Sequence, residues 1–115
     1  MPADCLFCRI AAKELPAKFV FENERIVAFA DLHPQAPAHV QLIPRKHIAS
    51  TLEVGEEDRA IVGELVQTAA GLARELGFAD DGFRLVFNTN GAAGQSVYHL
   101  HLHLLGGRTF RWPPG

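Results

Sequence analysis

The sequence has 115 residues, the size of one folded domain, and we expect a single domain over 1–115. Hydrophobic residues make up 48% and charged residues 21%, a composition that can build a packed interior and excludes a disordered polymer. The formal net charge of −2, with no basic block, excludes a protein whose main task is to coat nucleic acid or an anionic membrane.

The sequence also carries no membrane or export signal. No apolar run reaches the roughly 20 residues that a bilayer-spanning helix needs. Residues 1–5 lack the basic and hydrophobic segments of a secretory signal. We therefore expect a cytoplasmic protein without membrane partners.

In chain order, the first half of the sequence predicts a short helix followed by strands. An apolar segment at 6–12 predicts a helix that ends before Pro16, because a residue preceding proline disfavours helical backbone. Two β-type runs split by residues 22–25 predict a hairpin, and two prolines mark 34–37 as a loop.

The second half contains the one long predicted helix, at 56–76. Apolar residues recur there at helical spacing, acidic residues occupy the first turn, and Gly77 supplies the stop. The fold class is therefore α+β, with about five antiparallel strands and the long helix on one face. The strands are expected at 19–22, 26–30, 39–43, 83–88 and 98–105.

The two cysteines, Cys5 and Cys8, form a C-x-x-C pair. In a reducing compartment such a pair is either redox-active or half of a metal site. A redox motif of this kind follows a strand, and only four residues precede Cys5. The metal interpretation is therefore favoured.

Three histidines alternate with three leucines in the last predicted strand. Successive side chains of a strand point to opposite faces, so the leucines can face the helix while the histidines form a row spaced by roughly 7 Å. A slip of one residue would bury three imidazoles, which fixes the register. The row consists of His99, His101 and His103 opposite Leu100, Leu102 and Leu104. It binds a metal, carries out catalysis or arises by accident, and the strict alternation favours the first two.

The loop before this row favours a reaction on a phosphate. A neutral imidazole is a good nucleophile near neutral pH, because its ordinary pKa is about 6.5. Gly91 and Gly94 allow backbone N–H groups to approach an anion closely, and Gln95 and Ser96 add polar groups. The loop matches neither of the common phosphate-binding motifs, G-x-x-x-x-G-K-[ST] and G-x-G-x-x-G. The prediction of phosphate binding therefore depends on the histidines that follow the loop.

Segment 99–105 reads H-φ-H-φ-H-φ-φ, where φ is apolar, and resembles the signature of the histidine triad superfamily. Further motifs along nearly the whole chain resemble its Hint branch. They are Phe29-Ala30-Asp31, Pro34-Gln35-Ala36-Pro37-Ala38-His39, Ile43-Pro44-Arg45-Lys46-His47-Ile48, Gly94-Gln95-Ser96-Val97-Tyr98-His99 and Trp112-Pro113-Pro114-Gly115.

The resemblance implies a nucleotidyl hydrolase that cleaves purine nucleoside phosphoramidates, such as adenosine 5′-monophosphoramidate, and aminoacyl adenylates. It implies a homodimer whose sheets join, and a reaction that needs no cofactor. The alternatives are a dinucleoside polyphosphate hydrolase, a low-turnover nucleotide-binding or scaffold protein, and a zinc module with an idle histidine row.

The resemblance also implies catalytic roles. His101 would attack the α-phosphorus and form a covalent His–AMP intermediate that water hydrolyses, which splits one difficult displacement into two easier ones. His103 would hold phosphate oxygens and assist the leaving amine, and Ser96 would lie beside the scissile bond. His39 would be a fourth histidine near the triad, and His99 an orienting neighbour.

The same resemblance implies the substrate-binding residues. Asp31 would accept the ribose hydroxyls, a role that suits an acceptor-only carboxylate. The backbone around Gly94, Gln95 and Ser96 would bind phosphoryl oxygens, and Asn88 would contact phosphate or ribose. The base would lie among Phe7, Ile10, Phe29 and Leu32. His33 receives no role.

Finally, the resemblance pairs the two cysteines with two histidines. Cys5, Cys8, His47 and His99 would form a Cys2His2 set that holds a structural zinc ion. The metal would fix the N-terminal helix to the end of the last strand and so stabilise a small domain.

Overall fold

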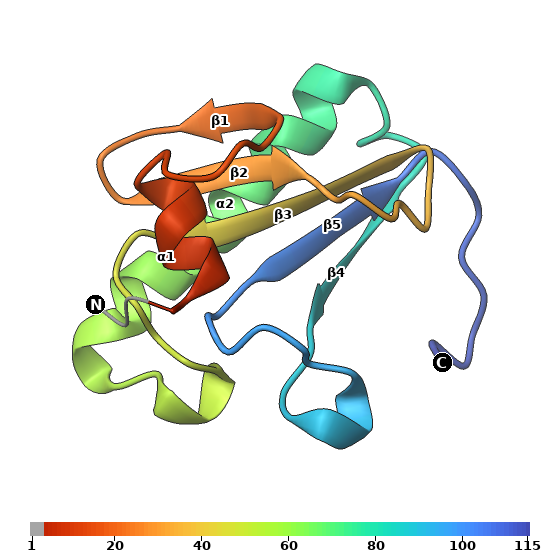
Figure 1. Cartoon of the computed structure of the whole chain (residues 1–115). Coiled ribbons are helices and arrows are strands. Elements are labelled where there is room, and N and C mark those ends of the chain that lie inside the picture. The colour runs from red at the N-terminus through yellow and green to blue at the C-terminus, as the bar shows by residue number, and fades with distance from the viewer. Residues whose placement is uncertain (1–3) are drawn as a thin grey trace.

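The computed structural model describes residues 4–115 and shows a five-stranded antiparallel sheet with a helix against each face (Figure 1). The order of the strands across the sheet is β1-β2-β3-β5-β4. In sequence the main elements are α1 (Leu6–Ala11), β1 (Phe19–Glu22), β2 (Ile26–Ala30), β3 (Ala38–Pro44), α2 (Arg59–Leu76), β4 (Phe83–Phe87) and β5 (Leu102–Gly106). The α+β class and the number of strands are as the sequence predicts.

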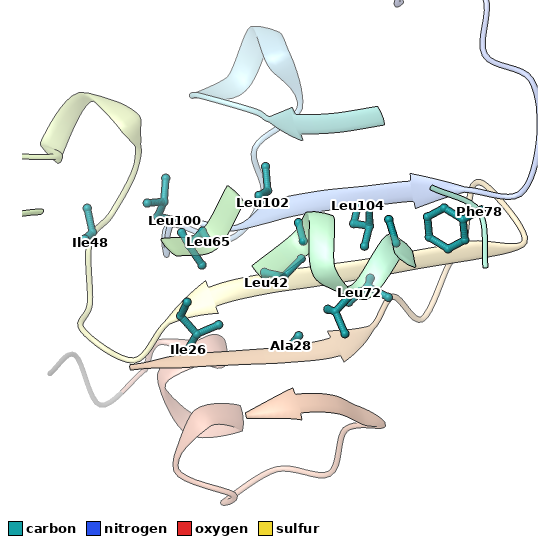
Figure 2. Packing of buried hydrophobic residues seen from close by; sticks show 13 residues of the cluster. Ile26, Ala28, Leu42, Ile48, Leu65, Leu72, Phe78, Leu100, Leu102 and Leu104 are labelled. Carbon is teal, nitrogen blue, oxygen red and sulfur yellow. The ribbon is translucent and has the colours of Figure 1, made fainter. Parts of the chain in front are cut away.

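Helix α2 covers one face of the sheet and closes the main core (Figure 2). Its buried residues, Leu65, Ala69, Leu72 and Ala73, recur at helical spacing. They meet the leucines of β5, and each fully buried leucine contributes roughly 1.5–3 kcal/mol. Val66 and Leu76, two other apolar residues of the predicted helix, are 40% and 49% exposed. Within residues 4–115, no helix has the length and apolarity that crossing a bilayer requires.

Helix α1 covers the opposite face of the sheet. Phe7 and Ile10 pack against Val27, Phe29 and Ile43 in a second, smaller cluster. The histidine row lies on this covered face, so His99 is completely buried and His101 only 8% exposed. Helix α1 and the turn that precedes it occupy the space over the row.

The long helix begins three residues later than predicted. Residues Glu56–Asp58 form a 3₁₀ turn, η2, and α2 starts at Arg59. Asp58 explains the step, since its Oδ2 accepts the backbone N–H of Gly55 and tightens that turn. At the other end Gly77 adopts a φ of 89°, the left-handed stop that the sequence predicts.

Strand β5 begins at Leu102 rather than near residue 98, so His99 and His101 precede the ladder. The last pair between β3 and β5 is Leu42 with Leu102, and continuing the register would bring Leu100 opposite Pro44. Proline has no N–H to donate there. Pro44 therefore cannot donate to the Leu100 carbonyl, and its own carbonyl accepts from His99 Nε2, so the N–H of Leu100 donates to the carbonyl of Ile48, at 2.6 Å.

Candidate active site

A cavity of about 330 Å³ lies between α1, the segment after β2 and the glycine-containing loop. That volume is in the range of small-molecule sites. It contains eight of the side chains or glycines predicted to bind substrate: Phe7, Ile10, Phe29, Asp31, Leu32, Asn88, Gly94 and Ser96. His101 and His103 line the same cavity, whereas His99 and His39 lie outside it.

Gln95 is the predicted residue whose side chain turns away. It is buried, and its amide nitrogen donates to the carbonyls of Ala49 and Val97 while its oxygen accepts the N–H of Asn90. The Gln95 side chain therefore holds the loop in place through these three hydrogen bonds. Gly94, with a φ of 89°, ends the η3 turn (Gly91–Ala93) in a conformation that disfavours other residues.

Seven residues to which the sequence motifs give no role also line the cavity. Gln41 could have been found, because it follows His39 by two positions in a predicted strand and so shares its face. His33 follows Asp31 by two positions, but no motif in the sequence indicates that it lines the site. The full set is Leu6, Pro16, Ala17, Ala30, His33, Gln41 and Val97.

His101 presents a free nitrogen lone pair. Its Nδ1 lies 2.7 Å from the carbonyl oxygen of His99, which can only accept, so Nδ1 carries the hydrogen and Nε2 does not. Burial lowers the pKa of His101 below its ordinary value, which keeps the ring neutral at pH 7. The Phe7 ring packs edge-on at 5.0 Å and fixes the imidazole plane.

His103 presents the opposite group, a hydrogen-bond donor. The N–H of Gln35 donates to His39 Nδ1 at 3.0 Å, so the hydrogen of His39 is on Nε2, 2.9 Å from His103 Nδ1. His103 therefore accepts at Nδ1 and carries its own hydrogen on Nε2. Burial lowers the pKa of His103 to about 4 and lowers that of His39 as well. A neutral donor thus stands next to the neutral acceptor of His101, with ring centres 5.0 Å apart.

Asp31 supplies the carboxylate of the cavity. Its Oδ1 accepts the N–H of His33 and its Oδ2 accepts the side-chain amide of Gln41, both at 2.8 Å. Asp31, His39 and His103 also lie close enough together to suggest a metal site. The hydrogen on His39 Nε2 blocks that use, because a ligating nitrogen needs its lone pair, so these residues form a hydrogen-bond network.

The four predicted metal ligands do meet. The sulfurs of Cys5 and Cys8 and the Nδ1 atoms of His47 and His99 lie within 4.8 Å of one another. His99 Nδ1 is 3.3 Å from His47 Nδ1 and 3.4 Å and 3.5 Å from the two sulfurs. In a tetrahedral zinc site, Zn–N bonds of about 2.0 Å and Zn–S bonds of about 2.3 Å give separations of about 3.3 Å and about 3.5 Å.

The protonation of this cluster also suits a cation. His99 Nε2 donates to the carbonyl of Pro44 at 2.8 Å, which leaves the Nδ1 lone pair directed at the sulfurs. Burial lowers the pKa of His99 to about 4 and raises that of the Cys8 thiol to about 11. A buried thiolate at this position therefore needs a positive charge beside it.

Comparison with known proteins identifies relatives of this chain in sequence and in fold. A family model described as "HIT domain" matches residues 12–110. A HIT-like protein of Synechococcus elongatus is 46% identical over the full length of both chains. The purine nucleoside phosphoramidase of Escherichia coli (strain K12) is 41% identical, over 94% of this chain and 91% of that protein. The crystal structure of a HIT family hydrolase from Legionella pneumophila Philadelphia 1 superposes with a TM-score of 0.96, at 51% identity, covering 97% of this chain and 100% of the other.

Proposed function

The chain belongs to the HIT domain family, and we propose that it is a nucleotidyl hydrolase that cleaves the P–N bond of purine nucleoside phosphoramidates. The observation that carries the proposal is the Nε2 lone pair of His101, fixed by the His99 carbonyl at the wall of a nucleoside-sized cavity. The name of the Escherichia coli relative, which is 41% identical, supports this substrate class.

The reaction proceeds in two displacements. His101 Nε2 attacks the α-phosphorus, the N–P bond to the ring forms, and the amine leaves and takes a proton from solvent. Water then attacks the phosphorus of the His101–AMP intermediate, which releases AMP and the neutral imidazole and returns a proton to solvent. The His99 carbonyl accepts from Nδ1 throughout and stabilises the transient positive charge on the ring.

The remaining roles follow from position in the cavity. The Nε2–H of His103 donates to a phosphoryl oxygen or the departing nitrogen, and the backbone at Gly94 and the hydroxyl of Ser96 contact the phosphoryl group. Asp31 accepts from the ribose and Asn88 lies on the phosphate or ribose side. The purine fits the apolar walls formed by Phe7, Ile10, Phe29 and Leu32.

The charge of the cavity favours an amine over a polyphosphate leaving group. Among the described residues that line it there is no lysine or arginine, while Asp31 contributes a negative charge. A dinucleoside polyphosphate would bring several negative charges into the cavity without a cationic partner. The free-energy cost of binding such unpaired charges rises as they are buried. We therefore expect adenosine 5′-monophosphoramidate to be cleaved faster than diadenosine tetraphosphate.

The test is His101→Ala. We expect the purified wild-type protein to release AMP from adenosine 5′-monophosphoramidate without added metal, and samples denatured in alkali, where a P–N bond survives, to show an AMP adduct on His101. The variant should lose at least about a thousandfold in kcat, since the nucleophile is gone. Turnover by the variant near the wild-type rate would contradict the mechanism. AMP binding by calorimetry without product from the wild type would favour the low-turnover binding protein.

We further propose that Cys5, Cys8, His47 and His99 hold a structural zinc ion. The support is the match of their separations to tetrahedral geometry and the lone pair of His99 directed at the sulfurs. A bound ion would tie the turn before α1 to the segment before β5, and it would keep the His99 carbonyl in place for His101. All four ligand positions would be filled by protein, so the ion would have no open site for catalysis.

Metal analysis tests the zinc proposal. We expect one zinc per chain, with Cys8→Ser and His47→Ala releasing it and lowering the melting temperature. His33→Ala is the matched histidine control, because His33 lies outside the cluster and should leave the zinc content unchanged. A wild-type protein that contains no zinc after expression with zinc, and does not take it up, would contradict the proposal.

The homodimer whose sheets join is also a proposal. Strand β4 is a sheet edge of five residues in regular register with β5, and its backbone has a free side within the described chain. A cytoplasmic location and a single domain over 1–115 stay predictions.

A further inference from the structure

The two polar atoms of the Gln41 side-chain amide differ in hydrogen bonding. Its Nε2 donates to Asp31 Oδ2 at 2.8 Å, whereas its Oε1 is the one buried side-chain polar atom of residues 4–115 without a hydrogen-bond partner. A buried acceptor without a donor is destabilising, so stability does not explain an amide here. The reason for an amide at this position must therefore be the hydrogen bond from Gln41 Nε2 to Asp31.

That bond occupies the stronger of two competing acceptors. His39 Nε2, which carries the hydrogen, lies 2.9 Å from His103 Nδ1 and 3.4 Å from Asp31 Oδ2. A carboxylate oxygen is a better acceptor than a neutral imidazole nitrogen. The Gln41 amide draws on the negative charge of Oδ2; without it, Oδ2 would be the stronger acceptor for the His39 hydrogen, and His103 Nδ1 would lose its donor in part of the molecules.

The sheet brings the competing groups together. His39 and Gln41 are two positions apart in β3 and share a face, and Gln41 pairs directly with His103 in β5. Asp31 follows β2, and its backbone N–H donates to the His39 carbonyl at 3.0 Å. Main-chain hydrogen bonds thus hold the backbones of the four residues next to one another.

We propose that Gln41 is a positioning residue: by occupying Asp31 Oδ2, it directs the His39 hydrogen to His103 and keeps the hydrogen of His103 on Nε2, where it faces the substrate. The catalytic value of this tautomer rests on the proposed function, but the tautomer itself does not. Gln41 touches neither reacting atom and acts through His39.

The experiment is nitrogen-15 NMR of the histidine side chains at pH 7 in the full chain. In the wild type we expect His103 to show an unprotonated Nδ1 and a protonated Nε2. Gln41→Met keeps the length of the side chain but removes the amide, and it should move His103 to a mixture of tautomers. His101, held by the His99 carbonyl, should keep its signature and so report an intact site.

A second variant tests the same competition independently. Asp31→Ala removes the competing acceptor, so His103 should keep the wild-type tautomer even though Gln41 has lost its partner. The double variant Asp31→Ala with Gln41→Met should also restore it. A wild-type His103 signature in Gln41→Met would overturn the proposal, as would a loss of that signature in Asp31→Ala.

Activity separates this proposal from the proposed function. If the wild type hydrolyses the phosphoramidate, Gln41→Met should lower kcat about tenfold, less than removal of a donor to the transition state typically does. A wild type without turnover would end the proposed function and leave the NMR result standing. Wild-type kcat in a variant with a shifted tautomer would overturn the catalytic role of Gln41.

Discussion

At the scale of single residues, two backbone carbonyls give neighbouring histidines opposite chemistry. The Pro44 carbonyl takes the hydrogen of His99 Nε2 and directs the Nδ1 lone pair to the cysteines. The His99 carbonyl takes the hydrogen of His101 Nδ1 and leaves Nε2 free at the cavity. Alternation predicts that these rings share a face, but it carries no information about their tautomers, which depend on acceptors from the chain around them.

Asp31→Asn tests the assignment of the sugar subsite. The amide loses the charge that strengthens a ribose hydrogen bond, and its NH2 group would oppose either the N–H of His33 or the amide of Gln41. We expect kcat/KM for adenosine phosphoramidate to fall about tenfold or more, from the roughly 1.5–3 kcal/mol of a charged hydrogen bond. The 2′,3′-dideoxy substrate should lose little. Equal losses for both sugars would place the ribose elsewhere.

At the scale of elements, the sequence predicts the type and order of the strands and helices but not every boundary. The Leu100–Leu102–Leu104 alternation continues before β5 because Leu100 is buried in the core although its backbone pairs with Ile48. Alternation thus detects burial, whereas the ladder depends on Pro44 in another strand. The short helix at 6–12 is also predictable, but its docking over the histidines depends on tertiary contacts of Phe7 and Ile10.

Two glycines test how closely the elements pack. A Cβ at Gly106 in β5 would overlap the ring of buried Phe78, whereas a Cβ at Gly63 in α2 would meet no atom within 4 Å. Gly106→Ala should lower the free energy of unfolding by about 1–3 kcal/mol through overpacking. Gly63→Ala should raise it by about 0.5–1 kcal/mol, because alanine favours the helix. Denaturant melts of both variants measure this, and an unchanged midpoint for Gly106→Ala would contradict the packing argument.

The start of α2 makes stability depend on pH. Lys46 donates to Asp58 Oδ1 at 2.6 Å, and this bond, with the Gly55 N–H, holds the pKa of Asp58 below its ordinary value. A carboxylate with a lowered folded pKa stabilises the fold above its unfolded pKa of about 3.9, and this contribution is lost as pH falls through the folded value.

Asp58→Asn should therefore be less stable than the wild type at pH 7. The difference in melting temperature should shrink below about pH 4, and also in high salt, which screens the charge pair. Glu75→Gln, at an exposed position of the same helix, is the matched control and should show little change. A difference that persists unchanged into acid would show that the charge of Asp58 is not responsible.

At the scale of the whole molecule, one face of the sheet holds the main core and the other holds the candidate site. The two edges of the sheet differ in register and in charge. Helix α2 lies on one face and α1 on the other (Figure 1). The first face carries the main core, and the second carries the cavity and the cysteine–histidine cluster. The edge strand β1 has four residues, an irregular register and the charged contacts of Glu22 to Lys13 and Arg45. The other edge, β4, is regular and mostly apolar, with half-buried residues throughout.

The difference between the edges predicts where a second copy pairs. Irregular, charged edges resist strand addition, and regular apolar ones permit it, so the partner should add to β4. The β4 amides that do not donate to β5 should then exchange slowly with deuterium at high protein concentration and faster on dilution, in step with the dimer fraction from sedimentation. The β1 amides serve as the internal control, because their exchange should not depend on concentration. Concentration-dependent protection at β1, or sedimentation as a monomer throughout, would contradict joining of the sheets through β4.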